Sequence, residues 1–249
     1  MRAAWPFVCL LLSVCVSAQV ARGQSAPAAL KISRLTGDFY VYVTYGDAGG
    51  GQPYPANGMY LVTKQGVVLF DTPWDTTQFQ PLLDSIRQRH GRPVVLCLAT
   101  HFHEDRTAGL AYYRSKGIAT YTSMATDKLS AEHHKPRAQH LLTGDTSFRI
   151  GGYRFDVIYP GKGHSPDNIV AWFPEQKVLY GGCFIKSVES PGPGNLSDAD
   201  VQAWIPSVKK VMERCPSPRF VIPGHQDWSD PRSVQHTLAI LERFLRENQ

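Results

Sequence analysis

The sequence has no dense run of lysine or arginine and no array of closely spaced aromatics, although the net charge of its 249 residues is +5. Nucleic-acid-binding proteins gather basic residues on one face, so this charge indicates an ordinary basic surface and no nucleic-acid partner. Repeats, charge blocks and low-complexity linkers are also absent. We therefore expect one compact domain over residues 27–249. The lack of a heptad pattern or an exposed apolar stripe favours a monomer.

Only one segment is apolar enough to suggest a membrane, and it is short. Phe7 to Val16 follows the charged Arg2 and precedes the small pair Ser17-Ala18. These are the features of a secretory signal peptide. We expect residues 1–18 to be removed, with cleavage between residues 18 and 26, and the mature protein to be periplasmic without stable membrane association. An uncleaved anchor is disfavoured because the run is too short to span a bilayer comfortably.

Cysteine is scarce: the chain has 5, and two of them precede residue 18. Cys97, Cys183 and Cys215 remain, and an odd number leaves at least one thiol outside an intramolecular disulfide. A metal ligand is one reason to keep a thiol free. Cys97 lies in an apolar run, which favours a buried core thiol. The sequence leaves a Cys97–Cys215 disulfide open.

The rest of the chain mixes two hydrophobic periods. Runs rich in Val, Tyr, Thr and other strand-forming residues predict strands at 39–45, 59–63, 67–70, 94–99, 154–159, 168–173, 177–180 and 220–222. Apolar residues at helical spacing predict helices at 79–86, at 201–212 and from 230 onward. The glycine-rich segment 46–58 predicts a mobile hairpin loop. Together these elements predict an α/β fold in which apolar helix faces cover sheets.

One predicted strand leads directly into a histidine motif. His101, His103 and Asp105 follow the run 94–99 and are spaced by two residues. In extended backbone this spacing points all three side chains the same way. The motif alone is moderately specific, because a chance His-x-His on a surface loop is common.

Three later residues raise its specificity. His164, Cys183 and His225 each follow a predicted strand and lie in a glycine-containing loop, which is where rigid scaffolds display functional side chains. Three imidazoles suit one zinc ion, and an aspartate, a thiolate and an imidazole suit a second. Two such ions could share one hydroxide, the nucleophile of a hydrolase. The six residues sort into two sets: His101, His103 and His164, and Asp105, Cys183 and His225.

This set resembles the metallo-β-lactamases, and more narrowly the first subclass of class B. The resemblance covers nearly the whole mature chain. Lys186, three residues after Cys183, matches the lysine that binds the substrate carboxylate, and Asn195 matches the asparagine beside the β-lactam carbonyl. Asp71-Thr-Pro-Trp74 resembles the family motif under the active site, and we expect Asp71 to hydrogen-bond near the ligands without binding metal.

The resemblance implies a fold and an activity. The fold is a four-layer αβ/βα sandwich with two zinc ions in a shallow groove at one edge. The activity is hydrolysis of the β-lactam amide bond of penicillins, cephalosporins and carbapenems by a metal-bound hydroxide, which confers antibiotic resistance. Asp105 would orient the nucleophile, Asn195 would polarise the carbonyl and help bind the substrate, and Lys186 would hold its carboxylate. The segment 46–56, with Tyr54, would close over the substrate.

Two residues distinguish the chain from other hydrolases of the wider superfamily. Arg106 stands where many members of the wider superfamily have a metal-binding histidine, and Cys183 where they often have a bridging aspartate. Both argue against a glyoxalase II, a tRNA-processing nuclease or a lactonase. The alternatives are another exported hydrolase on this fold, such as a lactonase or phosphodiesterase, or a zinc-binding periplasmic protein without catalysis. Arg106 itself could tune charge beside the metal or face solvent.

Overall fold

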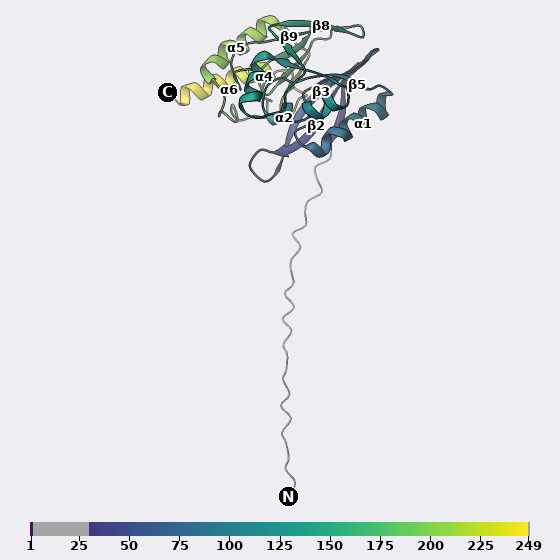
Figure 1. The fold of residues 1–249 in the computed structure, drawn as a ribbon. Coiled ribbons are helices and arrows are strands. Elements are labelled where there is room, and N and C mark those ends of the chain that lie inside the picture. Colours follow the sequence, from purple (N-terminus) through teal and green to yellow (C-terminus); the bar gives the residue numbers. More distant parts are fainter. Residues whose placement is uncertain (2–29, 249) are drawn as a thin grey trace.

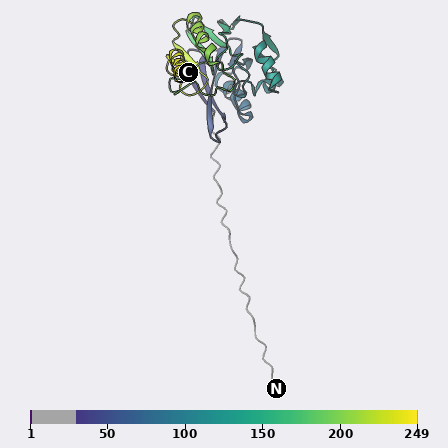
Figure 2. The same cartoon turned by 90° about the vertical axis from the view of Figure 1, so that its left-hand side faces the viewer.

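The computed structural model describes residue 1 and residues 30–248 (Figure 1). The expected signal peptide therefore lies almost entirely outside the described residues, as does the region of its cleavage site. Within the described part, no helix is long and apolar enough to cross a membrane. Two views at right angles show helices packed on the outside of two sheets (Figures 1 and 2).

The described chain begins with four strands, continues with alternating helices and strands, returns to a run of strands and ends with two helices that flank the last strand. The strands are β1 (Lys31–Thr36), β2 (Phe39–Asp47), β3 (Pro53–Thr63), β4 (Gly66–Phe70), β5 (Val94–Leu98), β6 (Ala119–Ser123), β7 (His140–Leu142), β8 (Thr146–Ile150), β9 (Tyr153–Ile158), β10 (Val170–Phe173), β11 (Val178–Gly182) and β12 (Phe220–Pro223). The helices are η1 (Thr76–Gln78), α1 (Phe79–His90), α2 (Glu104–Thr107), α3 (Leu110–Ser115), α4 (Met124–Glu132), α5 (Val201–Arg214) and α6 (Ser233–Glu247). Every predicted strand and helix is present; most ends shift by a few residues, and the strand predicted at 59–63 begins at Pro53.

The strands form two sheets. β1 to β7 make a seven-stranded sheet in sequence order, and the second sheet has the order β12-β11-β10-β9-β8. β4, β5, β6 and β7 run parallel, as do β11 and β12. Strands that run parallel end at the same edge of their sheet, so the loops after β11 and β12 lie at one edge of the second sheet, and the loops after β4 and β5 lie at one edge of the first.

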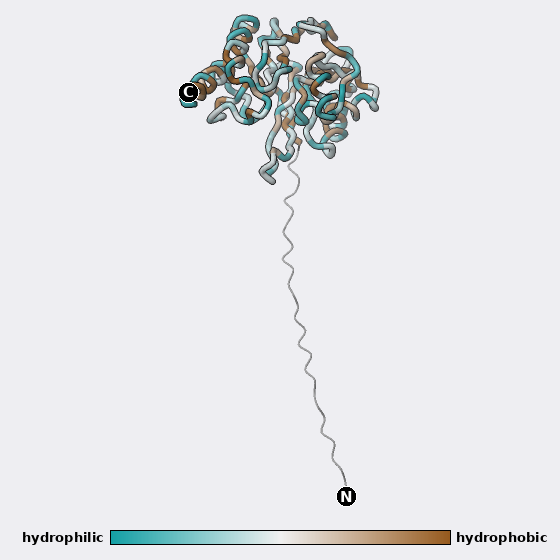
Figure 3. The backbone as a smooth tube through the Cα atoms, turned by 60° about the vertical axis from the view of Figure 1, so that its left-hand side comes forward, coloured by the Kyte–Doolittle hydropathy of each residue, from teal (hydrophilic) through white to brown (hydrophobic). Residues whose placement is uncertain are grey.

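Three buried apolar clusters hold the layers together. The central cluster joins the sheets, with Met59, Leu61 and Phe70 from the first packing on Phe155 and Phe173 from the second. A second cluster packs the opposite face of the first sheet on α1 and α3, and a third packs the second sheet on α5 and α6. The layers are helix, sheet, sheet and helix, which confirms the αβ/βα sandwich. Figure 3 shows the apolar segments concentrated in its interior.

The two hydrophobic periods explain how the layers form. In β3, Met59 and Leu61 face the central cluster while Tyr60 between them faces α1, because successive side chains of a strand point to opposite faces. In α1 the buried residues recur at helical spacing, and the helix ends at Gly91, whose φ of 64° suits glycine. The buried residues of α1 are Phe79, Leu82 and Ile86.

The predicted loop 46–58 is wrong in extent. β2 and β3 pair without a break from Phe39↔Leu61 to Asp47↔Pro53, so only residues 48–52 connect them. The glycine at position 58 is required inside the strand, because a Cβ there would lie 1.9 Å from the Tyr42 ring. Glycines and prolines suggested a loop, whereas the ladder continues through them almost to the tip.

The cysteines settle the question of a disulfide. Cys97, Cys183 and Cys215 are all free and buried. Cys97 lies in the cluster beneath α1, and Cys215 lies in the cluster beneath α5, on the far side of both sheets. No Cys97–Cys215 bridge is formed.

Candidate functional site

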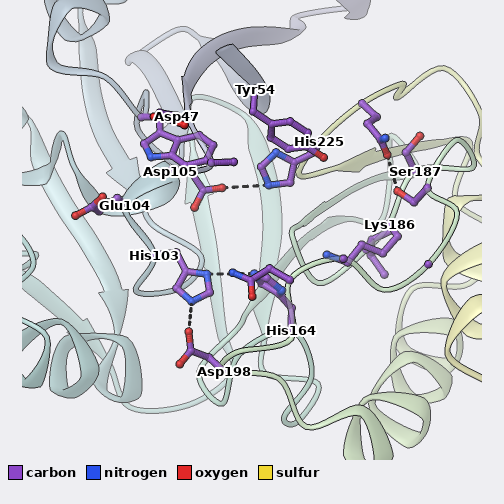
Figure 4. A pocket seen from close by; sticks show the side chains of 18 of the residues that line it. Asp47, Tyr54, His103, Glu104, Asp105, His164, Lys186, Ser187, Asp198 and His225 are labelled. Atoms are coloured by element: carbon purple, nitrogen blue, oxygen red, sulfur yellow. Dashed lines mark hydrogen bonds and ion pairs between the residues drawn. The ribbon is translucent and has the colours of Figure 1, made fainter. Parts of the chain in front are cut away.

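The histidine motif brings its residues together by a turn and not by an extended strand, so the predicted backbone geometry is wrong. His101 follows β5, His103 has extended backbone (φ −65°, ψ 153°) and begins α2, and Asp105 lies in the first turn of that helix. Because the backbone turns at His103, the side chains of the motif point in two directions. His101 lies beside His103 and His164. Figure 4 shows His103 pointing toward His164, whereas the side chain of Asp105 points toward His225.

Three imidazoles form the first ligand set. Nε2 of His101 lies 3.0 Å from Nδ1 of His103, and that same Nδ1 lies 3.1 Å from Nε2 of His164. The three donor atoms all lie within 4.8 Å of one another. Burial lowers the pKa of His101 and of His164 well below the usual value, so both rings are neutral and keep a lone pair for a metal.

The other ring nitrogen of His103 is held by an acidic residue that the sequence analysis did not single out. Nε2 of His103 lies 2.9 Å from Oδ2 of Asp198, in the loop before α5 (Figure 4). A proton on Nε2 directed at this carboxylate leaves Nδ1 as the free donor. The pair spans 95 residues of sequence, and no local pattern marks Asp198 as a partner.

An aspartate, a thiol and an imidazole form the second set. Oδ2 of Asp105 lies 3.4 Å from Sγ of Cys183 and 3.3 Å from Nε2 of His225. Sγ of Cys183 lies 3.2 Å from Nε2 of His225. Nδ1 of His225 donates to the backbone oxygen of Pro55 at 2.7 Å, which leaves Nε2 as the lone-pair donor.

Both sets fit zinc by distance and by chemistry. Two ligands about 2.0–2.3 Å from a tetrahedral ion are about 3.3–3.7 Å apart, close to the separations observed in each set. Nitrogen, thiolate and carboxylate donors are the ones zinc takes. The structure therefore gathers the six predicted donors into two neighbouring groups, and the chain has donors suited to two zinc ions.

Arg106 is buried beneath the second set, with 1 % of its surface exposed. Nη2 donates to Sγ of Cys183 at 3.0 Å and lies 2.9 Å from Oδ2 of Asp105. Burial alone would raise the pKa of Asp105, but the guanidinium and His225 bring it well below the usual value. Burial also raises the pKa of the Cys183 thiol, and Arg106 opposes that rise. The arginine thus sets the charge beside the ligands and does not face solvent.

Asp71 anchors Arg106 from behind. Its carboxylate accepts from the backbone nitrogen of Thr100 at 2.7 Å, from the Tyr180 hydroxyl at 2.6 Å and from Nη1 of Arg106 at 3.3 Å. Its φ of 63° lies in the left-handed region, which aspartate tolerates better than most residues. Asp71 contacts Thr100, which precedes the ligand His101, and Arg106, which contacts Asp105 and Cys183.

A groove of about 700 Å³ opens above both ligand sets. Lys186 lines it, almost buried, with Nζ 5.2 Å from the centre of the Trp204 ring. Asn195 lines it from an exposed loop, where Oδ1 accepts from the backbone nitrogen of Ser197 at 3.0 Å. That bond points the carbonyl end of the Asn195 amide toward its own loop and leaves the amide nitrogen available. Lys186 and Asn195 therefore lie where a substrate over the ligands would meet them.

The β2–β3 hairpin forms the upper wall of this groove. The Tyr54 ring lies 5.1 Å from the His225 ring, and Figure 4 shows the two side by side. Trp74 also lines the groove, and its ring lies 6.3 Å from the same imidazole. With the bond from His225 to Pro55, these contacts join the hairpin to a residue of the second ligand set.

Comparisons with known proteins agree with this geometry. Residues 51–225 match the family model of the metallo-beta-lactamase superfamily. The chain is 42 % identical over 240 residues to a metallo-beta-lactamase type 2 of Elizabethkingia meningoseptica, covering 96 % of each. It is 39 % identical to metallo-beta-lactamase IND-1 of Chryseobacterium indologenes, covering 95 % of this chain and 96 % of that one. The crystal structure of metallo-beta-lactamase IND-7 superposes with a TM-score of 0.81 at 39 % identity, over 86 % of this chain and 98 % of that one. The chain belongs to the metallo-beta-lactamase superfamily.

Proposed function

We propose that this chain hydrolyses the amide bond of β-lactams, including penicillins, cephalosporins and carbapenems, with two zinc ions as cofactors, and so confers antibiotic resistance. The observation that carries the proposal is the pairing of two complete zinc-ligand sets with a nearly buried ammonium group in one groove. A non-catalytic zinc protein has no need for a cation held in that position. The relatives named above are metallo-beta-lactamases over almost their whole length.

The ligand residues divide the work. His101, His103 and His164 would hold one zinc ion, and Asp105, Cys183 and His225 the other. Zinc in such a site lowers the pKa of a bound water to about 7 and so supplies a nucleophile at neutral pH. The chain contributes neutral imidazoles on one side and an ionised Asp105 on the other.

Asp105 and Asn195 would act on the reacting atoms. Oδ2 of Asp105 belongs to the second set, while its carboxylate also lies within 4.8 Å of the His101 donor. It can therefore accept a hydrogen bond from the attacking water and orient it between the two sets. The amide nitrogen of Asn195 would donate to the carbonyl oxygen of the substrate as negative charge develops there.

Lys186 would bind the carboxylate on the β-lactam nucleus. Replacing it with alanine removes a charge-assisted hydrogen bond worth about 1.5–3 kcal/mol, so KM for a cephalosporin should rise about ten- to hundred-fold. Lys209→Ala, on the exposed side of α5 and outside the groove, is the matched control. An unchanged KM in Lys186→Ala would remove this residue from the binding role.

The remaining proposals concern the whole chain. Export to the periplasm, removal of residues 1–18, a single domain over 27–249 and a monomeric state rest on sequence patterns alone. Another hydrolase activity on the same fold is the competing function. It is disfavoured because Arg106 and Cys183 occupy the positions at which the other hydrolases have metal-binding histidine and aspartate, and a panel of lactones and phosphodiesters tests it.

A further inference from the structure

The groove is lined by a second lysine that the mechanism does not use. Lys135 and Lys186 both line it. Lys135 forms an ion pair with Glu104, and Figure 4 shows Glu104 and Lys186 on opposite sides of the opening. A substrate whose carboxylate on the β-lactam nucleus binds Lys186 would therefore extend its other end toward Lys135.

The end of α4 fixes where Lys135 lies. The backbone nitrogen of Lys135 donates to the Ser130 oxygen at 2.7 Å, and that of His134 to the Ala131 oxygen at 3.3 Å. His134 has a φ of 55°. This is the Schellman arrangement that closes a helix, formed here without glycine. Lys135 is thus held at a defined point of the groove wall rather than on a free loop.

The partner of Lys135 is weakly bound. The Glu104 side chain is 55 % exposed, and that of Lys135 is 28 % exposed. Ion pairs this open to solvent contribute about 0.2–1 kcal/mol, so an incoming anion can displace the glutamate at small cost. Two other acidic groups of the groove already have partners away from Lys135. Asp198 is held by His103, and Asp47 by the backbone nitrogens of its own turn.

We infer that Lys135 is a second cationic subsite, which takes β-lactams whose acyl side chain carries an additional carboxylate, and that Glu104 competes with that carboxylate. The inference rests on the proposed β-lactam hydrolysis and names a substrate class within it. Glu104 neutralises Lys135 when the acyl side chain of the substrate is uncharged. The Glu104 carboxylate turns into solvent when the substrate brings its own carboxylate to Lys135.

The test uses two cephalosporins that differ only in the acyl side chain, which ends in a carboxylate in one and in its neutral amide in the other. The measured quantity is the ratio of KM for the neutral compound to KM for the anionic one, on the zinc-loaded protein. Lys135→Met should lower this ratio about two- to five-fold, and Glu104→Gln should raise it by a similar factor. Higher salt should lower the wild-type ratio because it screens the attraction between Lys135 and the additional carboxylate of the substrate.

A matched pair of charges on the same helix provides the control. Lys128 and Glu132 form an exposed ion pair at 3.8 Å on α4 and do not line the groove. Lys128→Met and Glu132→Gln should leave the ratio unchanged. A ratio that stays constant in both groove variants, or moves in the same direction in both, overturns the subsite while turnover of both compounds upholds the proposed function. Failure of the wild-type protein to hydrolyse either compound overturns both.

Discussion

At the scale of single residues, Arg106 has the widest set of contacts around the ligands. Its guanidinium donates to the backbone oxygens of Asn57 and Gly224 at 2.6 and 2.8 Å, besides its contacts to Cys183 and two carboxylates. Both terminal nitrogens of the buried guanidinium therefore have acceptors, whereas Nε has no hydrogen-bond partner. The Arg106 guanidinium forms ion pairs both with Asp71 beneath the site and with Asp105 in the second ligand set.

Arg106→Met tests this dependence. The change keeps much of the buried volume but leaves the carboxylates of Asp71 and Asp105 without their cation, and breaking a buried ion pair in this way costs about 3–5 kcal/mol. Urea unfolding of the metal-free protein should show that loss. Arg232→Met, which breaks the exposed pair with Asp230, should leave the free energy of unfolding close to that of the wild type. Equal losses in the two variants would contradict the account.

Asp71 predicts a pH dependence of stability. Burial raises its pKa to about 6, although Arg106, Tyr180 and Thr100 oppose that rise, whereas the unfolded value is near 3.8. Between these values the folded chain binds more protons than the unfolded chain, so the contribution of Asp71 to stability falls as pH rises through this window. The fall should be on the order of 1–3 kcal/mol.

The measurement compares the wild type with Asp71→Asn, since asparagine does not titrate. From pH 4 to pH 7, the free energy of unfolding of the metal-free wild type should fall by that amount relative to that of metal-free Asp71→Asn. A difference that moves in favour of the wild type as pH rises would mean that the folded pKa lies below 3.8.

At the scale of elements, the β2–β3 hairpin is built to rest on Trp74. A Cβ on Gly46 would lie 2.4 Å from the Trp74 ring, whereas a Cβ on Gly50 at the tip would meet nothing within 4 Å. Neither glycine has positive φ. The two positions therefore differ in the space around them and not in backbone strain.

Gly46→Ala should displace Trp74 or the hairpin. We expect a loss of about 1–3 kcal/mol in stability, as for other overpacked sites, together with a raised KM for β-lactams because the hairpin wall moves over His225. Gly50→Ala should leave both quantities close to wild type. If the two alanine variants behave alike in urea unfolding and in KM, the hairpin does not depend on this contact.

Elements with a clear apolar period were predictable from the sequence, and two elements that bury polar side chains, α4 and β6, were not. The helices α1, α5 and α6 show an apolar stripe, and the structure contains all three. Helix α4 was missed because its buried residues are Thr126, Asp127 and Ser130. Strand β6 was missed for the same reason, since it buries two threonines. Hydrophobic periodicity carries no signal where polar side chains fill the interior.

At the scale of the whole molecule, the order of layers follows from which faces are apolar. The meeting of the six ligands at one edge follows from where parallel strands end. The ligands could be chosen from sequence because three of them form a His-x-His-x-Asp motif directly after a predicted strand and the other three each follow a strand in a glycine-containing loop. The residues that orient them could not, because the bonds from Asp198 to His103 and from Pro55 to His225 join segments distant in the chain. Long-range partners of this kind leave no local pattern.

The most direct test of the account is the rate of carbapenem and cephalosporin hydrolysis by the purified protein, measured with zinc added, after removal of zinc by a chelator and after zinc is restored. The account predicts turnover with zinc, loss of turnover in chelator and recovery when zinc returns. Turnover that persists in a protein shown to be free of zinc would contradict it. So would the absence of turnover in a protein shown to hold two zinc ions per chain.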